Sequence, residues 1–523
     1  MPRLFALGSL CVACLAVPAA AEVTPAPIFG DHMVLQSGRP VPVFGATEPG
    51  GTVNLTCSVI ERSEGDAEEP IARAKTAQTV TADDAGRWQV EIGPFEPGQE
   101  LRFVLVDADE ANDEAARTVI SDVLVGDVWL CSGQSNMAWG LNRTLDAQRE
   151  IESANDEQIR LFTVPRHAAR EPQFGLKDEG KDGEPSSGRW VKLSPAAARR
   201  FSAVGYYFGT TLHDAIDQPV GLIHSSWGGT PSEAWTRPAA LESIESAAEL
   251  LASWERGEPL YKDRAQHRPG ALNNGMIAPL VPFALKGAIW YQGEANSGRP
   301  EQYDEIFPAM IEDWRAQFDQ ELPFFWVQLA NFMQYQENPN RNSSWAKLRE
   351  AQDNTLDELE NVGQAVIIDV GEARSIHPMN KKDVGERLAL AALKTLYGRT
   401  DPGMLSPRFE EAKIEGTTAT ITFDVDGDSL QVRRDESVGA DVAEGNEALG
   451  FAVAGPERAF YWAKAQVTGP NTVTVTAPAE VSEIVAIRYA WNDNPRITLF
   501  NTRGLPAAPF RTDDWEKTLN KRR

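Results

Sequence analysis

The spacing of apolar residues divides the chain into three parts, and the first of them has a two-residue period. Between residues 22 and 118, apolar and polar side chains alternate, which is typical of strands with one buried face. Turn-forming sequences such as Glu48-Pro49-Gly50-Gly51 separate these strands. The pattern predicts a small antiparallel β-sandwich. The alternating apolar positions are Val53, Leu55, Cys57 and Val59, and then Trp88, Val90 and Ile92.

Residues 119 to 404 have a different pattern, in which short apolar runs without alternation are separated by helical periodicity. Such runs are typical of strands that are covered on both faces, so we expect a doubly wound parallel sheet in an α/β domain. The expected strands are Val128–Cys131, Val220–Ile223, Ala288–Tyr291, Phe324–Leu329 and Ala365–Ile368. The expected helix faces carry Phe201, Val204, Phe208 and Leu212; Tyr303, Phe307, Met310 and Trp314; and Val384, Leu388 and Leu396.

Alternation returns from residue 405 to the end of the chain at 523. One expected strand carries Ala419, Ile421 and Phe423, and another carries Val473 and Val475. The sequence therefore predicts a second β-sandwich-like domain over residues 405–523, after an N-terminal one over 22–118 and a catalytic-type α/β domain over 119–404.

Charge and composition exclude some classes of partner. The chain has 523 residues and a net charge of 50 − 76 = −26. Excess negative charge repels phosphate backbones and anionic lipid surfaces, so we expect neither nucleic acid nor membrane as a partner. The sequence does not indicate an oligomeric state.

The first 21 residues are typical of a secretory signal peptide. Arg3 precedes an apolar run from Leu4 to Val17, and small residues follow it up to Ala21. We therefore expect an exported protein, either periplasmic or secreted. Cleavage would leave two cysteines, Cys57 and Cys131, which we expect to be unpaired thiols inside the core.

A serine and a histidine are placed as a hydrolase requires. Ser135 follows the strand that ends at Cys131, where we expect a helix to begin, and His377 follows the strand expected at 365–368. The carboxyl ends of parallel strands meet at one edge of a sheet, so the two side chains can form a nucleophile and its base. A helix N-cap would also explain Ser135. His224, which also follows a strand, is the rival candidate for the base.

Candidate oxyanion donors and sugar-binding residues follow the same strands. The side chains of Gln292 and Asn296, and the backbone of Gly228 and Gly229, could stabilise a developing oxyanion. Tryptophans near these loops could stack on sugar rings, although core packing is the commoner fate of a tryptophan. The tryptophans near the expected site are Trp139, Trp227, Trp235 and Trp290.

Several motifs together resemble the sialate O-acetylesterases, a branch of the SGNH hydrolases. They are Cys131-Ser-Gly-Gln-Ser-Asn-Met137, Trp290-Tyr-Gln-Gly-Glu-Ala-Asn296 and Ile376-His-Pro378, with further likeness at His32–Gln36, Asn274–Pro279, Arg488–Asn492 and Gly504–Pro506. The resemblance implies an SGNH-like fold and a serine esterase that removes acetyl groups from sugar hydroxyls without a metal or cofactor. It also implies Ser135 as nucleophile and His377 as base. The implied oxyanion donors are the Ser135 amide, Gly228 or Gly229, and Gln292 in preference to Asn296.

One position departs from the family pattern. SGNH enzymes usually carry an aspartate three residues before the histidine, and here that residue is Arg374. The third member of a triad holds the imidazole tautomer, so another carboxylate or a backbone carbonyl could replace it. The carboxylates that we consider are Asp369, Glu372 and Glu294.

The substrate is left open between two kinds of acetylated carbohydrate. A sialic acid carries a carboxylate, which Arg374 or Arg488 could bind, and Trp491 is a further expected sugar contact. An acetylated xylan, xyloglucan or pectin is the alternative. A third hypothesis, motivated by the missing aspartate, is an inactive protein that only binds carbohydrate.

Overall fold

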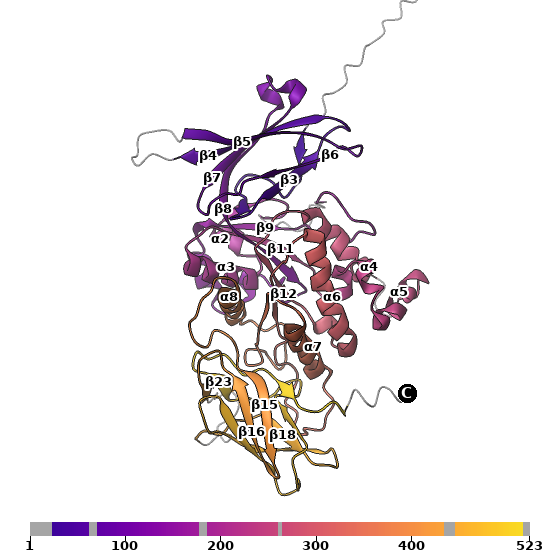
Figure 1. Cartoon of the computed structure of the whole chain (residues 1–523), viewed down its shortest axis with the longest axis vertical. Coiled ribbons are helices and arrows are strands. Elements are labelled where there is room, and N and C mark those ends of the chain that lie inside the picture. Colours follow the sequence, from indigo (N-terminus) through magenta and orange to yellow (C-terminus); the bar gives the residue numbers. More distant parts are fainter. Residues whose placement is uncertain (1–22, 62–70, 177–185, 260–263, 434–444, 516–523) are drawn as a thin grey trace, which may run out of the picture.

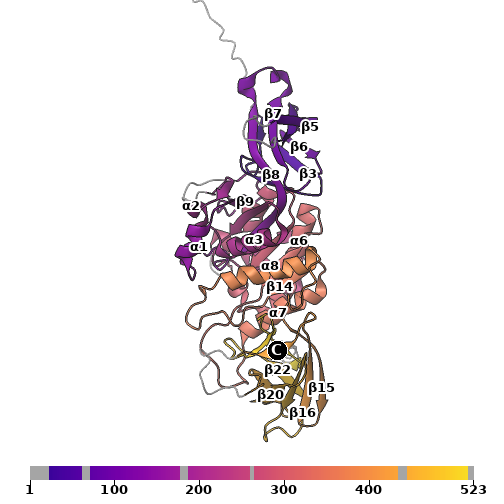
Figure 2. The same ribbon diagram turned by 90° about the vertical axis from the view of Figure 1, so that its left-hand side faces the viewer.

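The computed structural model describes residues 23–61, 71–176, 186–259, 264–433 and 445–515. The signal peptide predicted over residues 1–21 lies outside these ranges. Three parts follow one another along the long axis of the molecule, with the β-rich N- and C-terminal parts at opposite ends of a central α/β part (Figures 1 and 2).

The N-terminal part contains two sheets, and one of them shares its last strand, β8, with the central part. The smaller sheet has the order β1-β3-β6, with β1 at Thr24–Pro25, β3 at Val41–Ala46 and β6 at Arg87–Ile92. In the other, β5 pairs with β4, β4 with β7, and β7 with β8, while the short β2 lies parallel to β8. These strands are β2 Val34–Gln36, β4 Thr52–Glu61, β5 Ile71–Thr81, β7 Glu100–Asp107 and β8 Thr118–Gly133.

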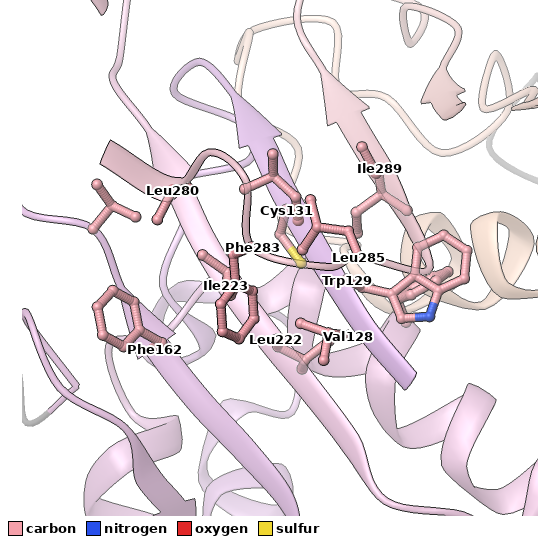
Figure 3. Close-up of a cluster of buried hydrophobic side chains, with 14 of the residues drawn as sticks. Val128, Trp129, Cys131, Phe162, Leu222, Ile223, Leu280, Phe283, Leu285 and Ile289 are labelled. Atoms are coloured by element: carbon pink, nitrogen blue, oxygen red, sulfur yellow. The ribbon is translucent and has the colours of Figure 1, made fainter. Parts of the chain in front are cut away.

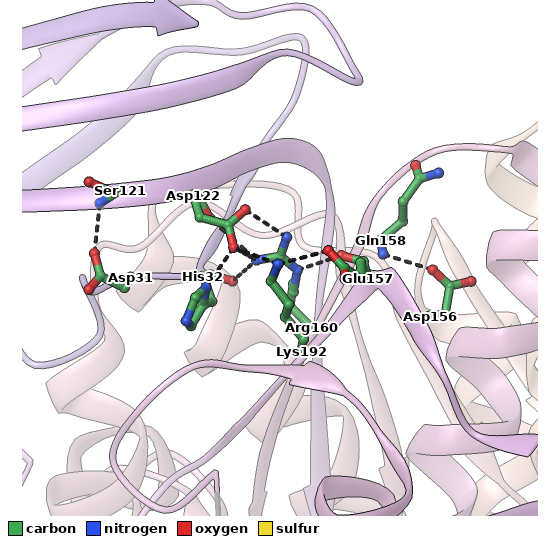
Figure 4. A network of polar contacts seen from close by, with 9 residues as sticks. All are labelled: Asp31, His32, Ser121, Asp122, Asp156, Glu157, Gln158, Arg160 and Lys192. Carbon is green, nitrogen blue, oxygen red and sulfur yellow. Dashed lines mark hydrogen bonds and ion pairs between the residues drawn. The ribbon is translucent and has the colours of Figure 1, made fainter. Parts of the chain in front are cut away.

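Strand β8 joins two parts that the sequence separates at residues 118–119. Its first half pairs with β7, and its second half, from Asp127 to Gly133, lies between β11 and β12 in the central sheet. A partly buried network spans this junction, in which Arg160 donates to both carboxylate oxygens of Asp122 at 3.0 and 3.2 Å (Figure 4). Burial alone would raise the pKa of Asp122, but the hydrogen bonds from Arg160 and His32 outweigh it and lower that pKa to about 2.

The central sheet has the order β10-β9-β11-β8-β12-β13-β14, and all neighbours are parallel except β10 and β9. The expected all-parallel sheet is therefore a mixed one, which continues into the antiparallel N-terminal strands through β8. The strands are β9 Asp156–Thr163, β10 Val191–Leu193, β11 Val220–Ser226, β12 Gly287–Tyr291, β13 Phe324–Val327 and β14 Val362–Ala365.

Helices cover both faces of the central sheet, with α3 and α8 on one face and α6 and α7 on the other (Figures 1 and 2). This cover explains why β11, β12, β13 and the second half of β8 are buried throughout. Figure 3 shows part of this buried cluster, including Trp129, Ile223 and Phe283. The helices are α1 Ala147–Ser153, α2 Pro195–Ala198, α3 Ala203–Ile216, α4 Pro238–Leu241, α5 Ala248–Glu255, α6 Pro300–Phe318, α7 Ser344–Glu358 and α8 Lys382–Leu396.

The C-terminal part forms its own β core, with sheets ordered β15-β16-β21-β20, β19-β18-β22-β24 and β17-β23. Val366 and Ile368 of the central part are buried in this core. The strand expected at Ala365–Ile368 is thus wrong in position, because the chain leaves the central sheet after Ala365 and its next apolar side chains pack against the C-terminal part. The strands are β15 Arg408–Glu415, β16 Thr418–Asp424, β17 Leu430–Val432, β18 Phe451–Ala454, β19 Phe460–Trp462, β20 Lys464–Val467, β21 Thr472–Thr476, β22 Ala486–Tyr489, β23 Leu499–Asn501 and β24 Phe510–Arg511.

Candidate active site

Three loops that follow adjacent strands meet at one edge of the central sheet. Ser135 lies two residues after β8, Gly228 lies two residues after β11, and Gln292 follows β12 directly. In the sheet, β8 lies between β11 and β12. The parallel arrangement of these strands therefore brings the three loops together.

Ser135 and His377 are in hydrogen-bonding contact. The Oγ atom of Ser135 lies 2.8 Å from Nε2 of His377, and both residues are partly exposed. Ser135 lies in a single turn, in which the Ala138 N–H donates to the carbonyl of Gln134. The expected helix start at Ser135 is wrong, since the chain does not continue into a helix there, and a helix dipole is not what polarises this serine.

Asn136, the residue after Ser135, connects the loops that carry the two reactive groups. Its Nδ2 donates to the carbonyl of Ile376 at 2.9 Å and to Oε1 of Glu294 at 2.5 Å. Its Oδ1 accepts from Nζ of Lys381 at 2.6 Å. A buried amide with all these partners holds the serine turn and the histidine loop in one arrangement.

The imidazole of His377 is oriented by packing and by its own loop. The indole of Trp139 stacks on it, with ring centroids 5.1 Å apart and an interplanar angle of 20°. The Ser375 hydroxyl donates to the His377 carbonyl and accepts from its N–H. Ser375 thus stabilises the turn that presents His377.

Burial and two nearby cations lower the pKa of His377. Burial lowers the pKa of His377, and the charges of Lys381 and Arg143 lower it further. The Arg143 guanidinium lies over the Trp139 ring, 3.5 Å from its centroid, on the ring that stacks on His377. A neutral imidazole is the form that can accept the serine proton.

Lys381, which is buried, and Glu294, which is partly buried, lie beside this pair, and the described residues show no ion pair between them. Burial lowers the pKa of Lys381 to about 7, although Glu294 and Glu372 act in the opposite direction. Burial raises the pKa of Glu294 despite the hydrogen bond from Asn136, and its Oε2 atom has no described partner. Such opposed shifts in one cluster are typical of a functional site.

None of the three carboxylates considered for the triad contacts His377. Asp369 is held by Arg387 through two hydrogen bonds of 2.6 and 2.8 Å, and Glu372 accepts from the Met379 N–H at 2.7 Å. Glu294 bonds to Asn136. Within the described part of the chain, no hydrogen bond joins His377 to any of these three carboxylates, and the identity of the acid stays a prediction.

The amides expected to form the oxyanion hole are occupied. Gln292 is fully buried, and its Nε2 donates to Asn296 Oδ1 and to the carbonyl of Thr230. Asn296 Nδ2 donates to Glu233, and its Oδ1 also accepts from the Ser232 N–H. Both side chains therefore hold the loop after β11 in this arrangement, and their role as oxyanion donors stays a prediction.

Backbone groups beside Ser135 remain available. A Cβ atom on Gly228 would lie 3.3 Å from Cβ of Ser135, so the absence of a side chain lets the Gly228 backbone approach the nucleophile. Among the described residues, the N–H groups of Ser135 and Gly228 have no hydrogen-bond acceptor. Gly229 adopts φ +75°, which completes the turn after β11.

Comparisons with known proteins agree with this architecture. Residues 125–394 match the family model described as "Carbohydrate esterase, sialic acid-specific acetylesterase". That match covers more than half of the chain. The chain belongs to this family. The resemblance found from the sequence motifs is confirmed, and the protein is a carboxylic-ester hydrolase.

Individual relatives extend the likeness over nearly the whole chain. Sialate O-acetylesterases from Mus musculus and Homo sapiens are 28% and 29% identical, over 92% and 90% of this chain and 92% and 88% of theirs. A solved carbohydrate acetylesterase from Xanthomonas citri is 37% identical and has a TM-score of 0.78, over 94% of this chain and 100% of that one.

In this carbohydrate esterase, the aromatic residues predicted to bind sugar differ in their exposure. Trp139 and Trp227 are partly exposed, near the site. Trp290 is fully buried and packs edge-on against Trp235 and Trp314, so it is a core residue and its predicted sugar contact is wrong. Trp491 is also buried, beneath the guanidinium groups of Arg488 and Arg511.

The two arginines considered for a sugar carboxylate are also in different environments. Arg488 is buried and donates to both oxygens of Asp513, at 2.8 and 2.7 Å, which excludes it from ligand binding in this arrangement. Arg374 is exposed on the loop that carries His377. Only Arg374 of the two is therefore placed to reach a substrate.

The rival base His224 is paired with another serine. Its Nε2 lies 2.6 Å from Oγ of Ser226, both residues are buried, and burial lowers the pKa of His224 to about 3. The thiols of Cys57 and Cys131 are free and buried, as expected, and burial raises the pKa of Cys57 to about 12.

Sequence reasoning missed three residues of the site: Asn136, Arg143 and Lys381. Asn136 follows the serine within the recognised motif, and that adjacency was the available signal. Lys381 begins the helix after the histidine, but nothing in its neighbours indicates burial. In the described ranges, no cluster of three or more His, Cys, Asp or Glu side chains could hold a metal ion, and no helix has the length and apolarity to cross a membrane.

Proposed function

We propose that this esterase hydrolyses acetyl esters of sugar hydroxyls through a Ser135–His377 pair within an SGNH-like core. The observation that carries the proposal is the 2.8 Å contact between Ser135 Oγ and His377 Nε2, at a site where burial and two cations lower the pKa of the imidazole. Ser135 would be the nucleophile and His377 the general base.

The reaction has two steps. Ser135 Oγ attacks the acetyl carbonyl carbon while His377 takes its proton, and the resulting oxyanion accepts hydrogen bonds from the Ser135 and Gly228 N–H groups. The C–O bond to the sugar then breaks, and His377 returns the proton to the departing sugar oxygen. Water attacks the acetyl-enzyme with His377 again as base, which releases acetate and restores Ser135.

Stacking takes the place of the triad acid in this proposal. A carboxylate normally fixes the imidazole ring and stabilises its protonated form. Here Trp139 fixes the ring plane, and the Ser375 turn fixes the backbone of His377. Lys381 and Arg143 disfavour the protonated imidazole and lower its pKa. We therefore expect His377 to be a weaker base than the histidine of a complete triad, but one that stays unprotonated to a lower pH.

The proposal also covers the domain boundaries, the export of the protein and the class of substrate. Residues 22–118 and 405–523 would be separate β domains on either side of the catalytic part, and residues 1–21 would direct export to the periplasm or the medium. The substrate would be an O-acetylated carbohydrate, either a sialate, as for the named relatives, or a plant polysaccharide such as xylan, xyloglucan or pectin.

Acetate release from a panel of esters tests the proposal. The panel contains O-acetylated sialic acid, acetylated xylo-oligosaccharides, acetylated pectin and p-nitrophenyl acetate, with wild type and Ser135→Ala compared. We expect turnover of one sugar ester well above the others, lost in Ser135→Ala. Activity that survives in the folded variant would contradict the assigned nucleophile, and silence of wild type on every ester would contradict the esterase function.

A further inference from the structure

A cleft of about 540 Å³ lies beside the loop that carries His377, and none of the residues assigned to catalysis lines it. Its size is within the range of small-ligand sites. Three segments form its walls: the stretch from Asn331 to Tyr335 after β13, residues 369–374, and residues 494–497 of the C-terminal part. Arg374 is three residues before His377, so the cleft begins within about 11 Å of the base along the chain.

The floor of the cleft is held by polar contacts between these segments. Asn331 accepts from the Gly371 N–H at 2.7 Å and donates to Asn494 Oδ1 at 2.9 Å. Asn494 in turn donates to the carbonyl of Met333 at 2.7 Å. A side chain at Gly371 would collide with Asn331, since a Cβ there would lie 2.0 Å from the Asn331 carbonyl oxygen. The cleft is therefore preorganised rather than a loose gap between two parts.

The charge in this cleft is opposite to that of the whole chain. Among its described lining residues, the charged ones are Asp369, Arg374 and Arg496. Asp369 is neutralised by its two hydrogen bonds to Arg387. Arg374 and Arg496 are exposed, and neither has an ion-pair partner in the described part of the protein. A chain with net charge −26 thus presents two uncompensated guanidinium groups next to its catalytic loop.

An aromatic platform lies beside these cations. The guanidinium of Arg496 lies over the Tyr335 ring, 4.1 Å from its centroid. The Tyr335 ring is nearly parallel to that of Trp462, at 22° and 6.5 Å between centroids. Aromatic rings bind the apolar faces of sugars, and guanidinium groups bind carboxylates through paired hydrogen bonds.

We propose that this cleft binds a carboxylate-bearing sugar of the substrate, with Arg374 and Arg496 on the carboxylate and with Tyr335 holding the Arg496 guanidinium in place. The proposal rests on the proposed function, because it makes the cleft an extension of the esterase site toward an acidic glycan. The carboxylate could belong to a uronic acid unit of a polysaccharide or to a sialic acid, and the test below separates these two sources.

Direct binding, measured by calorimetry, tests the cleft independently of hydrolysis. The ligands carry no acetyl group: an oligogalacturonide, a sialyl-oligosaccharide and a neutral xylo-oligosaccharide of similar length. We expect one of the two acidic ligands to bind at least about tenfold more tightly than the neutral one, with an affinity that falls as salt is raised. The acidic ligand that binds identifies the source of the carboxylate.

Substitutions locate the binding. Arg374→Ala and Arg496→Ala should each weaken the acidic ligand at least about tenfold, the loss expected for a charge-assisted hydrogen bond. Arg117→Ala, which removes an exposed arginine of the N-terminal part, is the matched control and should bind as wild type. Equal binding of acidic and neutral ligands, no binding of either acidic ligand, or wild-type affinity in both cleft variants would overturn the proposal. Binding that persists in a protein without esterase activity would instead overturn the proposed function alone.

Discussion

Two serine–histidine pairs lie near the ends of adjacent strands of this protein, and their differences show why we propose only one of them as the catalytic centre. Ser226 and His224, at the end of β11, are 2.6 Å apart, and Ser135 and His377, beyond β8, are 2.8 Å apart. By distance alone the two pairs are equivalent. The first pair is buried and the second is partly exposed. Hydrogen-bond geometry is therefore necessary for a nucleophile and its base, but it does not identify them.

The surroundings of the two pairs differ more than their distances do. Burial lowers the pKa of His224 to about 3, so this imidazole stays neutral and has no access to a substrate. Ser135, the partner of His377, lies against the Gly228 backbone, and two groups with opposed pKa shifts, Lys381 and Glu294, are tied to the same loops through Asn136. The Ser226–His224 pair is part of the buried core. The Ser135–His377 pair is partly exposed to solvent, with backbone N–H groups that have no described acceptor and neighbours whose pKa values are shifted.

Removal of His377 should have the largest effect. We expect His377→Ala to lower kcat/KM for p-nitrophenyl acetate by at least about 10³-fold, because Ser135 loses its base. The double variant with Ser135→Ala should be little worse, since the two residues act as a unit. His224→Asn, in a variant confirmed to fold by circular dichroism, is the matched control. A comparable loss of activity in His224→Asn would contradict the claim that only the Ser135–His377 pair is catalytic.

Lys381→Met should have the next largest effect. The change leaves the buried Asn136 Oδ1 without its donor, which costs about 1–3 kcal/mol, and loosens the tie between the Ser135 turn and the His377 loop. We expect about a 10- to 100-fold fall in kcat with a smaller change in KM. Lys382→Met, which removes the exposed neighbouring lysine, is the control. Steady-state kinetics measure this effect, and wild-type activity of Lys381→Met would contradict a role for Lys381 in the site.

Arg143→Gln should change the pH profile more than the maximal rate. Arg143 lowers the pKa of His377, so without it that pKa rises and the imidazole becomes protonated at a higher pH. The acid limb of kcat/KM should therefore move to higher pH, while the plateau falls by only a few-fold. Arg149→Gln, on the exposed face of α1, should not move the limb. A shift toward lower pH would contradict the electrostatic assignment.

Ser226→Ala should have the smallest effect on activity and a measurable one on stability. Loss of the buried hydrogen bond to His224 should lower the free energy of unfolding by about 1–3 kcal/mol, while kcat/KM changes by less than about tenfold. Because the pKa of His224 is lowered on folding, wild-type stability should fall as the pH drops from the ordinary histidine range toward 3. Urea unfolding at several pH values measures both effects.

Most strands and helices of the central part could be predicted from the sequence, because they follow from local patterns of apolar residues. Uninterrupted apolar runs located four strands of the central sheet, and a 3.6-residue period located α3, α6 and α8. The fifth strand was misplaced because Val366 and Ile368 are as apolar as a strand but pack into the C-terminal core. Only the tertiary arrangement distinguishes these two ways of burying an apolar run.

The site was predicted in part for the same reason. Ser135 and His377 could be paired from the sequence because each follows a strand of one sheet. The sequence leaves the roles of Gln292 and Asn296 open, since an amide side chain after a strand is equally suited to an oxyanion hole and to a loop. Their contacts with Thr230 and Glu233 are visible only in the tertiary structure. The acid could not be predicted either, because Asp369 is close in sequence but is bound by Arg387.

Covalent labelling of the nucleophile tests the account most directly. A fluorophosphonate reacts with a serine that an adjacent base activates, and mass spectrometry of the digested protein identifies the modified residue. The account predicts a single adduct on Ser135, none on Ser226, and loss of labelling in His377→Ala but not in His224→Asn. An adduct on another residue, or undiminished labelling of Ser135 in His377→Ala, would contradict the claim that Ser135 and His377 form the catalytic pair.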